Sequence, residues 1–363
     1  MPLDLLATPT AELAAAARTH FGTDKGACLA ARVHAAAVLR GTFDPDELGA
    51  GPRTAAAWRE LATLVLPTVV DAVQEAGEHG PVTKRLLALH DGRTIESVAL
   101  PMGRGRSSLC VSTQVGCARA CTFCETGRLG LLRNLTAGEI TAQVTLQCRT
   151  QRPDSLVFMG MGEPLDNLPA LLRALEVLVD RHGFHYAQER LTVCTVGHVP
   201  GIEALRELGW KRLGLALSLN SADDAQRAEL MPHSVRYPLA AIQQALVDYR
   251  QRANLALGVH WCLLPGVNDR ERDADQLAAF VQPLGRTFVH VIPYNPGSAP
   301  IARAPSEAEV TTFVARLRAR GLAVRRRITK GRSVMAACGQ LGQPGQLGRA
   351  GPRGPAGGDV TAS

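Results

Sequence analysis

Three cysteines lie close together in the first half of the chain. Cys117, Cys121 and Cys124 fall within eight residues, and Phe123 directly precedes the third. Three thiols on one tight loop can bind three irons of a cubane iron–sulfur cluster and leave the fourth iron without a protein ligand. Such an iron can chelate the amino and carboxylate groups of S-adenosylmethionine and pass an electron to its sulfonium. The spacing therefore predicts a 4Fe-4S cluster that works with S-adenosylmethionine.

A structural zinc loop is the alternative for the same cysteines. Structural zinc takes four ligands, usually as two spaced pairs. The sequence has no second Cys-x-x-Cys and no His-x-x-x-His after the loop, and no fourth cysteine at a ferredoxin spacing. Cys110 could serve as a fourth ligand, so zinc stays a minor alternative and the open cluster is favoured.

Three short turns that follow predicted strands carry further candidate residues. The turn 160–164 has glycines that let backbone approach a ligand, and its Glu163 could hold an ammonium group. The turns 218–220 and 293–296 offer hydroxyl and amide groups suited to ribose or adenine. Ligands gather at the carboxyl ends of strands in parallel β/α sheets. The turn 160–164 is therefore a good candidate for the amino end of S-adenosylmethionine, whereas each of the other two alone is more often a simple turn.

Cys338 is the second unusual thiol. It lies near the end of the predicted folded region, and Gly331 and Gly339 bracket its segment. A segment of this kind could form a mobile loop that carries the thiol into a site. A lone buried cysteine more often behaves as a small apolar residue, and the same alternative applies to Cys110.

The composition is that of a globular protein. The chain has 363 residues, of which 46% are hydrophobic, and a net charge of +7. The sequence shows no apolar run of about 18 residues and no basic-then-apolar leader. Nine cysteines, an odd number, predict a reducing compartment in which thiols act as ligands or reactive groups. We therefore expect a cytoplasmic protein that contacts no membrane.

Positive charge is concentrated near the end of the folded region. Eight cations and no acid lie in one stretch, namely Arg316, Arg318, Arg320, Arg325, Arg326, Arg327, Lys330 and Arg332. A solvated helix face that runs into a strand edge is the simpler interpretation. An unbalanced cluster of this size more often faces a polyanion, which favours a phosphate backbone as the partner.

Alternating strands and helices are predicted to position these residues. Residues 1–80 predict a helical module, with a periodic stretch over 53–76, and residues 84–100 predict a hairpin around Asp91-Gly92. Later strands are predicted at 108–113, 155–159, 191–196, 213–219, 256–263, 288–292 and 322–328. Helices are predicted at 136–149, 167–182, 200–209, 238–252, 269–282 and 306–320. This alternation indicates a parallel β/α sheet, open or curled into a barrel, and the Gly- and Pro-rich tail from about 343 predicts disorder.

Several motifs together resemble the RlmN/Cfr family of radical S-adenosylmethionine RNA methyltransferases. The resemblance runs from about Glu96 to Leu341, and the motifs stand in the family's order. They are LCVSTQVGC at 109–117, RNLT at 133–136, FMGMGE at 158–163, LPGVND at 264–269 and AACGQL at 336–341. The cysteine loop alone would indicate only the radical S-adenosylmethionine superfamily.

The resemblance implies a fold and a set of ligands. The fold is α/β, a partial (β/α) barrel over residues 84–342, with a small N-terminal helical domain over 1–80 and a disordered tail over 343–363. The cluster ligands are Cys117, Cys121 and Cys124. The S-adenosylmethionine positions fall on Gly162, Glu163, Cys194, Ser218, Leu219, Asn220 and Asn295. Cys194 stands where the family usually has serine, and Asn220 stands where it usually has histidine.

The resemblance also implies roles in a reaction. Cys338 is the methyl-carrying cysteine, Cys110 is its transient disulfide partner and Glu96 is the proton acceptor. One S-adenosylmethionine would methylate Cys338, and a radical made from a second would activate this methyl group for addition to an adenine ring carbon. Large-subunit ribosomal RNA is the main substrate implied, with transfer RNA as a second. Carbon 2 and carbon 8 both stay open, although Thr126-Gly127 and Leu264-Pro265-Gly266 look nearer to the Cfr branch, which modifies carbon 8.

Two rival functions stay open. One is a radical S-adenosylmethionine enzyme that acts on a substrate other than RNA, against which Cys338 and the basic cluster argue. The other is a zinc- or cluster-stabilised nucleic-acid-binding module without catalysis. For the favoured enzyme we expect a monomer that receives electrons from a reductant such as flavodoxin or ferredoxin.

Overall fold

A 10-stranded sheet forms the centre of the computed structural model, which describes residues 2–22, 24–234, 236–250 and 255–342. The strand order is β14-β13-β12-β11-β10-β9-β6-β5-β4-β3. Strands β6 and β9 to β14 are parallel, whereas β3, β4 and β5 join the sheet as antiparallel neighbours. The predicted disordered tail, 343–363, lies outside the described residues.

The strands are short and agree closely with the predicted ones. The sheet consists of β3 (Thr68–Glu75), β4 (Val82–Ala88), β5 (Thr94–Gly103), β6 (Arg106–Cys110), β9 (Ser155–Phe158), β10 (Leu191–Thr195), β11 (Gly214–Ser218), β12 (Leu257–Leu263), β13 (Thr287–Pro293) and β14 (Val324–Arg326). Two smaller sheets pair β1 (Leu3–Asp4) with β2 (Ala62–Thr63) and β7 (Gln114–Gly116) with β8 (Leu131–Asn134). Each strand predicted after residue 107 is confirmed, while β7 and β8 were not predicted.

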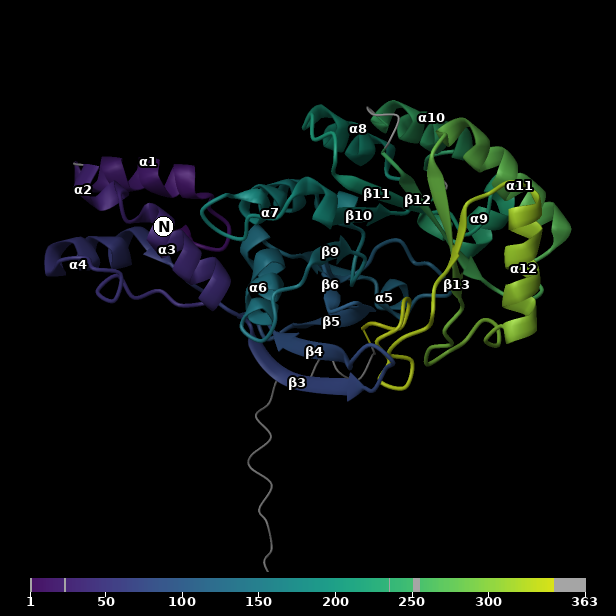
Figure 1. The fold of residues 1–363 in the computed structure, drawn as a ribbon, viewed down its shortest axis with the longest axis horizontal. Helices are drawn as coiled ribbons and strands as arrows, with labels where there is room; N and C mark the ends of the chain where they lie inside the picture. The colour runs from purple at the N-terminus through teal and green to yellow at the C-terminus, as the bar shows by residue number, and fades with distance from the viewer. Residues whose placement is uncertain (1, 23, 235, 251–254, 343–363) are drawn as a thin grey trace, which may run out of the picture.

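Helices alternate with the parallel strands and lie along the outer side of the curved row of strands (Figure 1). The α-helices in this part are α5 (Glu125–Arg128), α6 (Ala137–Cys148), α7 (Leu168–Val179), α8 (Val199–Glu207), α9 (Asp224–Leu230), α10 (Leu239–Tyr249), α11 (Glu271–Val281) and α12 (Glu307–Ala319). Short 3-10 turns are η2 (Pro164–Asn167), η3 (Gln188–Arg190), η4 (Pro232–Ser234) and η5 (Gln282–Leu284). The six predicted helices are confirmed, as is the partial-barrel fold class.

The N-terminal segment folds as helices up to Leu61. It contains α1 (Thr10–Phe21), α2 (Asp24–Ala27), α3 (Ala30–Ala35), the π-helix η1 (Ala36–Arg40) and α4 (Pro52–Leu61), packed around a hydrophobic cluster of their own. The prediction of a helical stretch over 53–76 is wrong in its second half, because Thr68–Glu75 forms β3 of the main sheet. Pro67 interrupts a helix, and the β-branched residues that follow it favour a strand. The boundary of the N-terminal domain at residue 80 stays a prediction.

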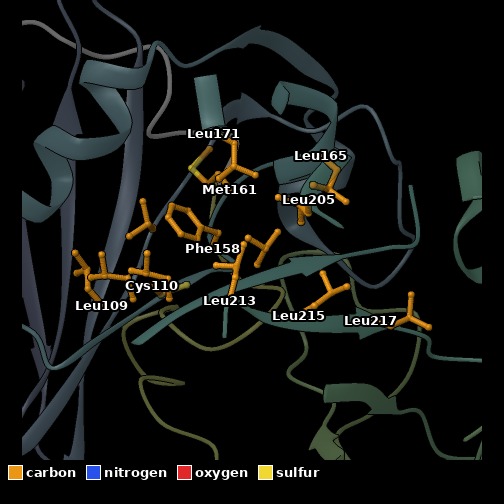
Figure 2. Packing of buried hydrophobic residues seen from close by; sticks show 14 of the residues in the cluster. Leu109, Cys110, Phe158, Met161, Leu165, Leu171, Leu205, Leu213, Leu215 and Leu217 are labelled. Atoms are coloured by element: carbon orange, nitrogen blue, oxygen red, sulfur yellow. The ribbon is translucent and has the colours of Figure 1, made fainter. Parts of the chain in front are cut away.

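Strand β12 shows how the sheet separates its two faces. Its Val259, Trp261 and Leu263 belong to the main hydrophobic core, whereas Gly258 and His260 line an inner cavity. This alternation follows from the two-residue period of a strand. Figure 2 shows the same core further along the sheet, where apolar side chains of neighbouring strands pack together; those labelled include Leu109, Phe158, Met161, Leu171, Leu213, Leu215 and Leu217. The helices therefore cover one face, and the other face is left for a site.

Residues 327–342, which we call the strap, cross the open side of the curved sheet. They follow β14 at one edge and reach β3, β4 and β5 at the other, where the yellow end of the chain lies near β4 in Figure 1. Glu75 of β3 accepts hydrogen bonds from the Gly331 and Ser333 N–H groups at 2.6 and 2.7 Å. Lys84 of β4 donates to the Met335 carbonyl at 3.3 Å. Side chains of β3 and β4 thus hold the strap against this edge of the sheet.

The described helices include none that is long and apolar enough to cross a membrane.

Candidate active site

A cavity of about 680 Å³ lies on the inner face of the sheet. Seven cysteines line it, namely Cys110, Cys117, Cys121, Cys124, Cys194, Cys262 and Cys338. They come from strands, from the loop after β7 and from the strap. The fold therefore brings together two thiol-bearing segments that lie more than two hundred residues apart in the sequence.

The cysteine loop is fixed by its flanking elements. It runs from β7 into α5, and the Cys117 N–H donates to the Gly130 carbonyl at 2.9 Å, beside the β7–β8 pair. Gly127 packs against the loop so closely that a Cβ atom there would lie 2.9 Å from the Cys121 nitrogen. Only glycine fits at this distance, so the short α5 can close against the loop. The backbone thus holds the three thiols toward the cavity.

Burial raises the pKa values of these thiols, so they stay protonated unless a positive charge lies beside them. It raises the pKa of Cys117 to about 12 and raises the pKa values of Cys121 and Cys124 as well. For Cys124 the backbone N–H groups of Gly127 and Thr126 act in the opposite direction. Iron supplies the missing positive charge, because metal ligation takes thiols as thiolates and releases their protons. Soft sulfur ligands in a buried loop therefore fit an iron–sulfur cluster.

The three thiols are not arranged around one point. Within the described residues, no group of three His, Cys, Asp or Glu side chains converges as it would on a single metal ion. A cubane cluster does not require such convergence, because each thiolate binds a different iron at a different corner. Within the loop, Arg119 forms a largely buried ion pair with Asp166, with 2.7 Å between Nε and Oδ2.

The glycine-rich turn after β9 positions Glu163. Gly162 has φ 98°, and a Cβ atom there would lie 2.5 Å from the Cβ of Gln114, so a larger residue would displace the turn. The Glu163 N–H donates to the Gln114 side-chain carbonyl at 2.8 Å. One carboxylate oxygen accepts from the Val196 N–H at 2.9 Å and the other from the Leu165 N–H at 3.1 Å. The carboxylate is thus held in one orientation at the cavity wall.

No cation of the described residues forms an ion pair with the Glu163 carboxylate. Burial raises its pKa to about 7, against the opposing effect of the Val196 N–H, and Arg119 lowers it only weakly. A ligand ammonium group beside this carboxylate would keep it ionised. The position therefore suits the amino group of an amino-acid ligand.

The other predicted cofactor residues do not all face the cavity. Ser218, Cys194 and Asn295 line it, whereas the Leu219 side chain is buried in the core, and only its neighbours reach the cavity. Burial raises the pKa of the Cys194 thiol to about 12, so it is neutral. Asn220 lines the cavity with φ 60°, a left-handed conformation that asparagine tolerates.

Two of these amides are already engaged by the protein. The Asn220 side-chain oxygen accepts from the Cys262 N–H at 2.9 Å, which ties β11 to β12. The Asn295 oxygen accepts from Arg332 of the strap at 3.1 Å, and its NH₂ group donates to the Cys338 carbonyl at 3.4 Å. In this arrangement Asn295 holds the segment that carries Cys338.

Cys338 and Cys110 both line the cavity, and Cys338 is close enough to Cys110 to affect its pKa. Cys338 has solvent-accessible surface because it borders the cavity, although protein atoms surround it on the other sides. Burial raises its pKa, and the Arg327 guanidinium opposes this shift. Cys110, at the end of β6, is buried, and burial followed by the nearby Cys338 raises its pKa. Arg327 is thus the cation that favours the reactive thiolate form of Cys338.

The strap is attached directly to the cysteine loop. The Glu125 N–H donates to the Gly339 carbonyl at 2.8 Å, and the Thr126 hydroxyl donates to the Leu341 carbonyl at 2.7 Å. Both donors directly follow Cys124 in the sequence. The geometry thus ties the segment of Cys338 to the loop of the three cysteines.

Glu96, the predicted proton acceptor, is not among the residues that line the cavity. It lies on β5 with 1% of its surface exposed, 2.9 Å from the Lys84 ammonium group. The Gly342 N–H also donates to its carboxylate at 2.7 Å. The end of the strap therefore covers Glu96, and the predicted role stays a prediction.

The basic cluster is partly neutralised in three dimensions. Arg316 and Arg320 pair with Glu271 of α11 at 2.6 and 2.7 Å, and Arg326 pairs with Glu307 of α12. These acids lie outside the stretch that the sequence analysis considered, so the charge there is lower than it appeared. Arg327 and Lys330 line the cavity.

Sequence reasoning did not assign His260, Cys262 or His290 to the site, and it singled out Arg327 only as part of the basic cluster, although all four line the cavity. They occupy predicted strands or the residue after one. Alternation along β12 would have placed His260 and Cys262 on one face, but the sequence does not indicate which face is the inner one. The sequence alone does not show which face of β12 the helices cover.

Comparisons with known proteins identify relatives of this chain. Residues 111–278 match the model of the radical SAM superfamily. The chain is 41% identical over 333 residues to a probable RNA methyltransferase of Sorangium cellulosum, covering 87% of this chain and 82% of that protein. It is 42% identical to the dual-specificity RNA methyltransferase RlmN of Anaeromyxobacter sp., covering 83% and 81% of the two chains. A crystal structure of a radical SAM methyltransferase from Sphaerobacter thermophilus superposes with a TM-score of 0.84 at 34% identity, covering 94% of this chain and 99% of that chain.

Proposed function

The chain belongs to the RlmN/Cfr family of radical S-adenosylmethionine RNA methyltransferases, and from this membership we propose that it methylates a ring carbon, carbon 2 or carbon 8, of an adenosine in RNA. It is a methyltransferase that uses S-adenosylmethionine and a 4Fe-4S cluster. The alternative of a non-catalytic nucleic-acid-binding module is therefore wrong. Large-subunit ribosomal RNA is the proposed substrate, with transfer RNA as a second.

One observation carries the proposal: Cys338 and Cys110 line the same cavity as the three loop cysteines. An enzyme that only generated a radical would need the loop alone. Two further thiols, from β6 and from the strap, provide a carrier for the methyl group and a partner that can release the product. Among the described residues, no three Cys, His, Asp or Glu side chains converge as the ligands of one zinc ion would.

The loop cysteines and the turn after β9 would hold the cofactors. Cys117, Cys121 and Cys124 bind the cluster, and Glu163 takes the ammonium group of S-adenosylmethionine. Ser218, Cys194, Asn220 and Asn295, with the backbone of Gly162 and Leu219, provide the surrounding positions. When bound, these groups supply a 5′-deoxyadenosyl radical, which can remove hydrogen from an unactivated methyl group.

Two thiols of the chain would carry the methyl group and release the product. Cys338 receives a methyl group on its sulfur by displacement, for which it must be a thiolate, and Arg327 favours that form. After carbon transfer to the adenine, the Cys110 thiolate attacks the Cys338 sulfur and forms a disulfide, the bond between that sulfur and the transferred methylene breaks, and the methylene takes up a proton to become the methyl group of the product. An external reductant then restores both thiols.

Glu96 would accept the ring proton only after the strap moves. Its carboxylate is bonded to Lys84 and to the Gly342 N–H, so the strap end must leave before RNA can approach it. The proposed base is therefore covered in this structure, beside the Lys84 ammonium group.

Mass spectrometry of RNA tests the proposal. Ribosomal and transfer RNA from cells with and without the gene are digested to nucleosides, and methyladenosines are separated by ring position. We expect one ring-carbon methyladenosine that depends on the gene and on Cys338. Identical nucleoside profiles in both cells, together with inactive reconstituted protein on the same RNA, would refute the proposed function.

We further propose that the protein acts as a cytoplasmic monomer and receives electrons from flavodoxin or ferredoxin. Light scattering of the reconstituted protein tests the first point. Product formation with each purified reductant in place of a chemical one tests the second.

A further inference from the structure

A row of three polar side chains crosses the inner face of the sheet below the strand ends. Ser218 of β11 is level with His260 of β12, and His260 is level with His290 of β13. All three line the cavity. The two imidazole rings lie 5.2 Å apart, nearly perpendicular to each other at 79°.

His260 is a buried side chain with one unpaired ring nitrogen. Only 4% of its surface is exposed, and among the described residues its buried Nδ1 has no hydrogen-bond partner. Burial, followed by the charge of Arg327, holds its pKa well below the usual value, so the ring is neutral. Buried polar atoms are nearly always hydrogen-bonded, and an exception calls for an explanation such as a missing ligand.

The hydrogen bonding of His290 defines its tautomer. The Arg327 Nε–H donates to His290 Nδ1 at 3.2 Å. Burial, with Arg327 and Arg325, lowers the pKa of His290 to about 4, so the ring is neutral at pH 7. A neutral imidazole that accepts at Nδ1 carries its hydrogen on Nε2. His290 therefore offers an N–H donor, and His260 offers its unpaired Nδ1, which donates or accepts according to the tautomer.

These groups match the edge of an adenine ring. Adenine presents ring nitrogens that accept hydrogen bonds next to an amino group that donates them. A neutral pair of imidazoles can satisfy both kinds of group without placing a charge against a neutral base. The cavity also continues past the row to the first halves of the strands, where Thr192, Leu257 and Phe288 line it. There is thus space below the proposed S-adenosylmethionine positions.

We propose that His260 and His290, with Arg327 fixing the His290 tautomer, form the subsite that recognises the adenine base of the target nucleotide. This inference rests on the proposed function. Arg327 serves both Cys338 and His290, which puts the row on the side of the cavity where the methyl group is carried. The adenine of S-adenosylmethionine has the same chemistry, so the test separates the two sources.

The experiment uses the reconstituted full-length protein in two assays. The first measures methylation of Cys338 by S-adenosylmethionine without RNA, by mass spectrometry of the Cys338 peptide. The second measures methyl transfer to total RNA from cells that lack the gene. The variants are His260→Leu, which keeps a similar volume without polar atoms, and His260→Asn, which restores a donor and an acceptor. His290→Leu tests the second ring, and His20→Ala on α1 is the matched control.

We expect kcat/KM for RNA to fall by about tenfold or more in His260→Leu and His290→Leu, as for the loss of a buried hydrogen bond, and to recover in part in His260→Asn. The KM for S-adenosylmethionine in the RNA-free assay should stay within about twofold. His260→Leu should melt no lower than the unaltered protein, because it removes an unsatisfied polar group from a buried site.

Three results would overturn the inference. A raised KM for S-adenosylmethionine without RNA would assign the row to the cofactor. A lower melting temperature with equal losses in both assays would show a structural role. Unchanged RNA kinetics in both leucine variants would show no role at all. If instead the unaltered protein methylates Cys338 but no RNA, the proposed function fails and the subsite fails with it.

Discussion

The cysteine loop 117–124 and the strap 327–342 both present thiols to one cavity, but they are held in different ways. The loop lies between β7 and α5, where backbone contacts to these neighbours hold it, and within it Thr122 donates to the Leu230 carbonyl and Arg119 pairs with Asp166. Side chains from distant elements hold the strap: Glu75 on β3, Lys84 on β4, Thr126 on α5 and Asn295 after β13. The proposed cluster site thus has backbone contacts to its immediate neighbours as its main support. The proposed carrier thiol, which would meet two S-adenosylmethionine molecules, RNA and Cys110 in turn, lies on a segment whose side-chain attachments can be exchanged.

Removing one loop cysteine should have the largest effect. In Cys117→Ala the cluster loses one of three ligands, so we expect iron content, 5′-deoxyadenosine formation and RNA methylation all to fall to background. Iron analysis and product chromatography after anaerobic reconstitution measure these losses. Cys28→Ala, in the turn between α2 and α3, should keep all three. If Cys117→Ala kept its iron and its turnover, the cysteine loop would not be the cluster site that distinguishes it from the strap.

Removing the strap thiol should separate the two regions. In Cys338→Ala we expect full iron content and continued formation of 5′-deoxyadenosine, but no detectable methylation of RNA. Cys110→Ala should instead leave protein joined covalently to RNA, because the thiol that releases the product is gone. Denaturing gels with labelled RNA show this adduct. Free methylated RNA from either variant would count against the carrier role of Cys338.

A substitution of Glu163 tests the side of the cavity that is proposed to bind S-adenosylmethionine. In Glu163→Gln the charge opposite the ligand ammonium is lost, so the KM for S-adenosylmethionine should rise by about tenfold or more. The raised pKa of about 7 means that the carboxylate forms as pH rises through 7, so binding in the unaltered protein should strengthen from pH 6 to pH 8. The variant should lose most of this dependence, as titration calorimetry at the two pH values would show.

The same group has the opposite effect on the stability of the ligand-free protein. The folded protein binds more protons at Glu163 than the unfolded chain between the ordinary pKa of 4.5 and the folded value of about 7. The contribution of Glu163 to the free energy of unfolding therefore falls as pH rises through this window. Melting curves without ligand should show a smaller loss of stability from pH 5 to pH 8 in Glu163→Gln than in the unaltered protein. An equal loss would contradict a buried carboxylate.

Glu75 tests the attachment of the strap and should have the smallest effect. Glu75→Gln weakens the bonds to Gly331 and Ser333, so amide exchange in the strap should become faster and RNA methylation should change by about threefold. Iron content should stay the same. Glu78→Gln, on the adjacent turn, is the matched control. A loss of iron in Glu75→Gln would mean that the two regions are not separately supported.

The sequence predicted the parallel strands and their helices because each carries its own periodicity and end signals, such as the capping box of Thr136 and Glu139. It also singled out the three loop cysteines, since their ligand spacing is local. It could not predict β3, because apolar spacing over 53–76 suits a helix as well as a strand edge. Nor could it show that Glu96 is covered by Gly342 or that Arg320 is paired with Glu271, because those partners come from remote parts of the chain.

The strap also has a consequence for the order in which the enzyme is built. A ribosome makes about 5–20 residues per second, and the N-terminal parts of a protein generally fold first. The sheet, ending with β14 at Arg326, and the cysteine loop are thus synthesised before Cys338, the proposed methyl carrier. A nascent chain arrested before Gly331 would contain every strand that the structure describes and the three proposed cluster ligands, but not the proposed carrier. On the proposed function, chemistry on RNA therefore becomes available only after the sheet and the cysteine loop have been made.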